Sequence, residues 1–147
     1  GGAWRIPAVS APIPPGRKVV PIRWRDMDGF DHVNNAVYLN YLEEGRDAWL
    51  THAVEGSGVT FNDFVVRHVS IDFVSALTQD DGAAVVEVTV ESVGGSSITL
   101  RETVHAESDG RLAASARGVL VHTNADHSAS QPLPDVLRAR LEASVEP

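Results

Sequence analysis

The chain of 147 residues contains no cysteine. This absence excludes disulfide bonds, thiolate metal ligands and a cysteine nucleophile. Long apolar runs are also missing, because no apolar stretch approaches the length that crosses a bilayer. The first residues do not join a basic stretch to an apolar one, as a secretion signal does. We therefore expect a cytoplasmic protein with no membrane partner.

Positive charge is scarce as well. The 20 acidic residues outnumber the 12 basic ones, and the formal net charge is −8 at pH 7. Proteins that bind nucleic acid carry a basic surface because they contact phosphates. The composition therefore argues against a nucleic acid partner. A polyanionic ligand would have to be bound by local arginines or by backbone N–H groups.

Several signatures of catalysis are absent. There is no G-x-S-x-G motif, so a serine-triad hydrolase is not expected. Neither a phosphate-binding loop nor a dinucleotide fingerprint is present. The later histidines do not have the spacing of metal ligands, namely His52, His68, His105, His122 and His127. We expect no metal ion and no cofactor.

What the sequence does contain is the pattern of one α+β domain. The proline-rich residues 1–16 predict an extended arm, residues 17–123 the domain itself, and residues 124–147 a tail with a short helix at 136–143. One long helix should begin at Asn34 or Asn35, either of which suits its N-cap. Turn signals separate runs with strand-like alternation, which predict strands at residues 19–24, 64–74, 83–93, 97–106 and 112–123.

The long helix has an unusually broad apolar face. At 100° per residue, its apolar side chains cover more than half of the circumference. We therefore expect a curved sheet to wrap around it. Gly45 falls on the apolar face, where the missing side chain would let a strand approach closely. Arg46 falls there too, and a buried charge requires an acidic partner.

The most informative stretch directly precedes this helix and reads Asp26-Met27-Asp28-Gly29-Phe30-Asp31-His32-Val33-Asn34-Asn35. A helix N-terminus presents unpaired N–H groups and a partial positive charge. A carboxylate held a few residues upstream can face the same pocket as these donors. Together they form the minimum equipment for attack on a carbonyl group: a base or nucleophile, and donors for the oxyanion.

Residues 25–46 resemble the hotdog-fold acyl-CoA thioesterases of the 4-hydroxybenzoyl-CoA thioesterase type. The signature of that family reads roughly D-x-D-x-x-G-H-V-N-N-x-x-Y, followed by E-E-x-R on the helix. One departure is Asp31, which stands where the family usually has glycine. The resemblance implies a hotdog fold, in which a curved antiparallel sheet wraps around one central helix. It also implies hydrolysis of an acyl-CoA to free acid and CoA, in a homodimer or a dimer of dimers.

By this resemblance Asp28 is the catalytic carboxylate, either as the nucleophile or as the general base for water. The alternative is that Asp28 has a purely structural role as an Asx-turn residue. The backbone N–H near Asn35 would polarise the thioester carbonyl. His32 is a secondary catalytic candidate. We expect Asp26 to be structural, bonded to local N–H groups or paired with Arg25 or Arg46.

Glu43 is the rival catalytic base, since it lies a little over two helical turns beyond Asn35. Its alternative role is the buried partner of Arg46. Asn34 and Tyr38 are predicted to bind substrate, although Asn34 suits a helix cap equally well. The glycine-rich turn with Gly95, Ser96 and Ser97 is predicted to lie near the CoA entrance. Two other functions stay open: a non-catalytic acyl-ligand-binding module, and a hotdog hydratase or dehydratase.

Overall fold

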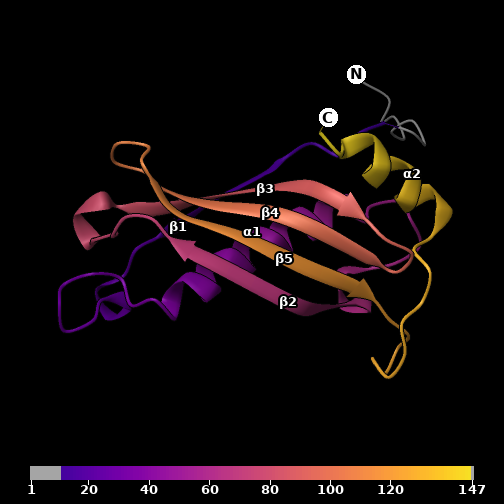
Figure 1. Ribbon diagram of the computed structural model, residues 1–147, viewed down its shortest axis with the longest axis horizontal. Coiled ribbons are helices and arrows are strands. Elements are labelled where there is room, and N and C mark those ends of the chain that lie inside the picture. Colours follow the sequence, from indigo (N-terminus) through magenta and orange to yellow (C-terminus); the bar gives the residue numbers. More distant parts are fainter. Residues whose placement is uncertain (1–10, 147) are drawn as a thin grey trace, which may run out of the picture.

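The computed structural model describes residues 11–146, and Figure 1 shows one antiparallel sheet with a long helix behind it. The sheet has five strands in the order β1-β3-β4-β5-β2. The strands are β1 (Gly16–Pro21), β2 (Phe64–Phe73), β3 (Ala83–Val93), β4 (Ser97–Ala106) and β5 (Leu112–His122), and the α-helices are α1 (Val37–Ala53) and α2 (Asp135–Ser144). All four strand pairings are antiparallel.

The last four strands agree with the sequence prediction to within one residue, whereas the first does not. It covers residues 16–21 rather than 19–24, because Trp24–Asp26 forms a 3-10 turn. The Asp26 carboxylate stabilises this turn by accepting the Arg23 N–H at 2.9 Å. Of the predicted arm, residues 1–10 lie outside the described part of the chain.

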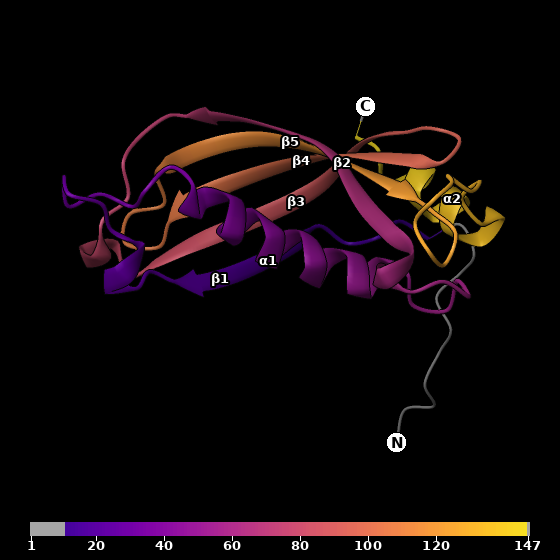
Figure 2. The same ribbon diagram turned by 90° about the horizontal axis from the view of Figure 1, so that it is seen from below.

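Helix α1 runs along the concave side of the sheet, as Figure 2 shows. Gly45 permits this close approach, because a Cβ atom added there would lie 2.8 Å from Cβ of Val86 on β3. The role predicted for Gly45 is therefore confirmed. The buried face of α1 is narrower than the apolar pattern predicted. Leu39, which is 48% exposed, and Ala48 face away from the sheet in the single chain.

Arg46 is buried beneath the sheet and pairs with Glu102 on β4, at 2.8 Å between Nε and Oε2 and 2.9 Å between Nη2 and Oε1. The prediction that Arg46 needs an acidic partner is confirmed, but the suggested partner, Glu43, is wrong. Glu43 is exposed and makes no ion pair with Arg46 within the described residues, where the partner of Arg46 is Glu102. Gly118 on β5 makes room for the pair, since an added Cβ would lie 3.0 Å from Oε1 of Glu102.

The C-terminal segment belongs to the same core. Leu133, Leu137 and Leu141 are buried in the cluster that also contains the inner residues of the sheet. Helix α2 lies at the end of the sheet opposite the loop that precedes α1, as both ribbon views show. No helix within residues 11–146 is long and apolar enough to cross a membrane.

Candidate active site

The loop before α1 is a tight turn closed by Asp28. Its N–H donates to the His32 carbonyl at 2.8 Å, and its Oδ1 accepts the Phe30 N–H at 2.8 Å and the His32 N–H at 3.4 Å. Asp28 is therefore an Asx-turn residue, as one prediction held. Its second carboxylate oxygen, Oδ2, accepts no hydrogen bond from residues 11–146. One oxygen thus fixes the loop, and the other stays available for chemistry.

Asp31 supplies the left-handed conformation that this turn needs. Its φ angle is 61°, one of two positive φ values at non-glycine residues in residues 11–146. Aspartate adopts this region more readily than most residues. The turn therefore forms with aspartate at the position where the family usually has glycine.

The N–H groups at the start of α1 have partners, with one exception. Hydrogen bonds are donated by Val33 to the Leu77 carbonyl, by Asn34 to the Asp26 carbonyl, by Ala36 to Oδ1 of Asn34, and by Val37 to the Asn34 carbonyl, each at 2.9 Å. The Asn35 N–H has no acceptor in the described part of the chain. The helix N-terminus therefore presents one free donor.

The N-cap itself is Ala36, so the prediction of Asn34 or Asn35 at that position is wrong. The chain passes through a turn at residues 34–37 before the regular helix starts. Asn34 still acts as a local cap, because its side-chain oxygen accepts the Ala36 N–H. This interaction occupies the side chain that was also predicted to contact substrate.

Asp28 and Asn35 line one cavity of about 270 Å³. His32, Val33 and Tyr38 complete the side formed by the loop and α1, and residues 73–76 form the opposite wall. The Phe73 ring packs edge-on against Tyr38, with ring centroids 5.2 Å apart. A carboxylate, a free N–H group and two aromatic rings therefore line the same cavity.

Asp26 supports the loop from beneath and does not line this cavity. It is 1% exposed, and it binds the Arg23 N–H and guanidinium and the Tyr41 hydroxyl. Burial by itself would raise the pKa of Asp26, but the hydrogen bonds from Arg23 and Tyr41 outweigh it and lower the pKa. Burial and the bond to Asp26 together raise the pKa of the Tyr41 hydroxyl. The structural role expected for Asp26 fits this geometry, with Arg23 as its partner instead of Arg25 or Arg46.

Glu43 and the glycine-rich turn lie elsewhere in the single chain. Glu43 is not among the residues that line the cavity, and it lies exposed on α1 more than one turn beyond Tyr38. Ser96 and Ser97 line a different pocket, together with Arg67 and His127. That pocket lies where β2 begins, because Ser97 pairs with Val121 and Phe64 pairs with the adjacent His122. The Asp28 cavity lies where β2 ends, about 30 Å away for a strand of this length.

The sequence prediction missed the wall at residues 73–76. These residues reach the cavity because β2 ends beside β5 and the Leu77 carbonyl accepts the Val33 N–H. The signal available in the sequence was the adjacent apolar pair Phe73-Val74 at the end of a predicted strand. Within residues 11–146, no group of three His, Asp or Glu side chains converges as metal ligands do.

A curved antiparallel sheet around one helix, with a carboxylate and a free N–H at the start of that helix, defines a protein of the hotdog thioesterase class. The model of the thioesterase-like superfamily matches residues 22–141, and the chain belongs to this family. The predicted hotdog fold and the predicted enzyme class, a thioester hydrolase, are thereby confirmed.

Three relatives illustrate the match. The long-chain acyl-CoA thioesterase FadM of Escherichia coli is 26% identical over 129 residues, which are 86% of this chain and 97% of that protein. A predicted thioesterase from Bacillus stearothermophilus superposes with a TM-score of 0.77 at 26% identity, over 90% of this chain and 98% of that one. A thioesterase from Thermus thermophilus, solved in complex with coenzyme A and Zn, has a TM-score of 0.71 at 32% identity over 87% and 92% of the two chains.

Proposed function

We propose that the protein hydrolyses an acyl-CoA thioester, with Asp28 acting on the substrate carbonyl and the Asn35 N–H stabilising the oxyanion. The observation that carries this proposal is that Asp28, with its free Oδ2, and Asn35, with its unpaired N–H, line the same cavity. A fixed donor aimed at developing negative charge contributes a large share of catalysis in acyl transfer. The names of two relatives, an acyl-CoA thioesterase and a thioesterase bound to coenzyme A, support CoA as the thiol part of the substrate.

Two routes fit this geometry. In the first, Asp28 attacks the carbonyl carbon, the C–S bond breaks, CoA leaves as the thiolate, and water then hydrolyses the acyl-aspartyl anhydride. In the second, Asp28 removes a proton from water as the water oxygen attacks the carbonyl, and CoA leaves as the C–S bond breaks. Both routes need an ionised Asp28, so both predict the same effect of removing its charge.

The test is thiol release from a panel of short, long and aromatic acyl-CoAs by native protein and by Asp28→Asn. Asparagine keeps an oxygen that can accept the Phe30 N–H, so the turn should persist in this variant. We expect turnover to fall by a factor of about 10² or more. Asp31→Asn is the matched control, because it removes the same charge three residues away without touching the cavity lining.

Two other results would contradict the proposal. Turnover that persists in Asp28→Asn and disappears in Glu43→Gln would transfer the base role to Glu43. Saturable acyl-CoA binding without thiol release by native protein would replace hydrolysis with the acyl-binding alternative.

We further propose that the active form is a homodimer, alone or within a tetramer, that pairs along the free edge of β2. Val66 and Phe73 on this edge strand are each 48% exposed, and an uncovered edge is a template for pairing. Two-fold pairing brings the start of one β2 beside the end of the other. The pocket with Ser96 and Ser97 would then approach the Asp28 cavity of the second copy.

A further inference from the structure

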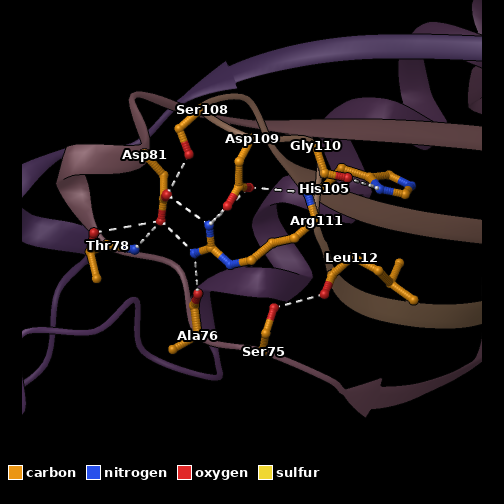
Figure 3. A network of polar contacts seen from close by, with 10 residues as sticks. All are labelled: Ser75, Ala76, Thr78, Asp81, His105, Ser108, Asp109, Gly110, Arg111 and Leu112. Atoms are coloured by element: carbon orange, nitrogen blue, oxygen red, sulfur yellow. Dashed lines mark hydrogen bonds and ion pairs between the residues drawn. The ribbon is translucent and has the colours of Figure 1, made fainter.

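Arg111, directly before β5, is held by two carboxylates, Asp81 and Asp109, and lies beside Ser75 and Ala76 (Figure 3). Its Nη1 and Nη2 lie 3.0 and 2.9 Å from the two oxygens of Asp81, and Nη1 also lies 3.0 Å from Asp109. Asp81 accepts further hydrogen bonds from the Ser108 hydroxyl at 2.6 Å and the Thr78 N–H at 2.9 Å. A bidentate pair of this kind fixes the guanidinium in position and orientation.

The same guanidinium reaches the cavity wall. Nη2 of Arg111 donates to the Ala76 carbonyl at 2.7 Å, and among residues 11–146 this is the one hydrogen bond that the carbonyl accepts. The neighbouring Ser75 hydroxyl donates to the Leu112 carbonyl at 2.7 Å. Two successive residues of the wall are therefore anchored to two successive residues where β5 begins, and Ala76 depends on a side chain for its anchor.

The segment after the wall is hydrogen-bonded to the loop before α1, which carries Asp28. Leu77 is fully buried, and its carbonyl accepts the Val33 N–H at 2.9 Å. Burial raises the pKa of the Tyr38 hydroxyl, which lies on the same side of the cavity as Val33. Leu77 thus contacts the side of the cavity formed by the loop and α1, one residue after the carbonyl that Arg111 binds.

We infer that Arg111 is a positioning residue for the reaction, one that fixes the Ala76 end of the wall at the distance from Asp28 that productive attack requires. This inference rests on the proposed function. Arg111 acts through Ala76 and Leu77 and does not touch the reacting atoms. Small errors of placement matter at such a site, since a displacement of about 1 Å can reduce turnover about 10²-fold.

The experiment compares Arg111→Gln and Arg111→Lys with Arg117→Gln. Arg117 is the matched control, because it also binds a carboxylate, at 2.9 Å between Nη2 and Oε1 of Glu91. It lies on the face of β5 opposite Gly118 and Glu102, hence on the outer face of the sheet. For each variant, kcat and KM are measured over the acyl-CoA panel at a temperature well below its own Tm, so that the folded protein alone is compared.

We expect kcat of Arg111→Gln to fall about 10-fold or more, with a loss that changes with the acyl group because the wall borders the space beside Asp28. Arg111→Lys should lie in between, since lysine keeps the charge but cannot bind Asp81 in bidentate form and Ala76 together. It also serves as the test if Arg111→Gln does not fold. Arg117→Gln should match native protein.

Two results would overturn the inference without affecting the proposed function. The first is a folded Arg111→Lys or Arg111→Gln protein with native kcat across the panel. The second is a loss of kcat that is the same for every acyl group in the panel. If native protein releases no thiol from any acyl-CoA, the proposed function fails, and the positioning role fails with it.

Discussion

The guanidinium of Arg46 and the carboxylate of Glu102 face each other between α1 and the sheet, with two hydrogen bonds of 2.8 and 2.9 Å. Glu102 is 0% exposed and Arg46 is 4% exposed. This buried ion pair links α1 to β4 and is shielded from solvent. Its main effect on stability is therefore the penalty that follows when one partner is removed.

Glu102→Gln should destabilise the protein by about 3–5 kcal/mol, because it leaves the Arg46 charge buried without a counterion. Urea unfolding at neutral pH measures the change. Glu91→Gln is the control, since Glu91 pairs with arginines on the exposed outer face of the same sheet, where ion pairs contribute little. Equal midpoints for the two variants would show that the buried pair has no special role.

Acid stability should depend on Asp81. Hydrogen bonds from Arg111 are the main reason that the pKa of this carboxyl lies well below its ordinary value of 3.8. A folded-state pKa below the unfolded-state value means that the carboxylate stabilises the fold above its ordinary pKa, and that this contribution disappears as the pH falls through the lowered pKa.

Asp81→Asn should therefore lower the urea midpoint at pH 7, and the difference from native protein should shrink as the pH is taken below 3.8. The neighbouring Asp80 is exposed, so Asp80→Asn should follow native protein at every pH. A difference between native protein and Asp81→Asn that is constant over the whole range would contradict the linkage.

The free N–H of Asn35 can be removed without disturbing the turn that presents it. The Val37 N–H donates to the Asn34 carbonyl at 2.9 Å, so Asn35 holds the second position of a turn. Proline is favoured at that position and lacks an N–H group. Asn35→Pro should reduce kcat by a factor of about 10²–10³, whereas Asn35→Ala, which keeps the N–H, should retain most activity. Loss of activity in the alanine variant alone would instead assign the role to the side chain.

Assembly along β2 can be tested at Val66. The side chain is exposed in the single chain, so Val66→Lys should leave the fold unchanged while opposing the pairing of two edges. Light scattering after size-exclusion chromatography should show an oligomer for native protein and a smaller species for the variant. Arg101→Lys, on the outer face of the sheet, should assemble normally. A native monomer at micromolar concentration would exclude the proposed dimer.

The sequence predicted those features that depend on neighbours in the chain. The Asp28 turn, the approximate start of α1 and the last four strands follow from turn residues, alternation and helical spacing. Asp31 could be expected to adopt its left-handed conformation, because the turn required one residue that tolerates it. Gly45 marked the contact with a strand, although the sequence alone could not name Val86.

The features that escaped prediction depend on pairing over long stretches of chain. Arg46 lies 56 residues from Glu102, and helical proximity favoured Glu43 as its partner. The wall at residues 73–76 meets the Asp28 loop only once β2 has paired with β5. Arg111 resembles any other arginine after an Asp-Gly turn until the sheet places it behind Ala76. For Arg46 the local pattern indicated the type of interaction and the topology determined the partner, whereas the wall and Arg111 depend on the topology alone.

The different roles of the two Asp28 carboxylate oxygens have a geometric consequence. Because Oδ1 is engaged by the Phe30 and His32 N–H groups, the side chain cannot rotate to exchange its two oxygens without opening the turn. If Asp28 acts as proposed, Oδ2 is therefore the reacting atom and has one direction of approach, and a thioester would present the same face of its carbonyl in every turnover. Selectivity between substrates would then arise from which acyl groups can adopt that single orientation against the aromatic wall.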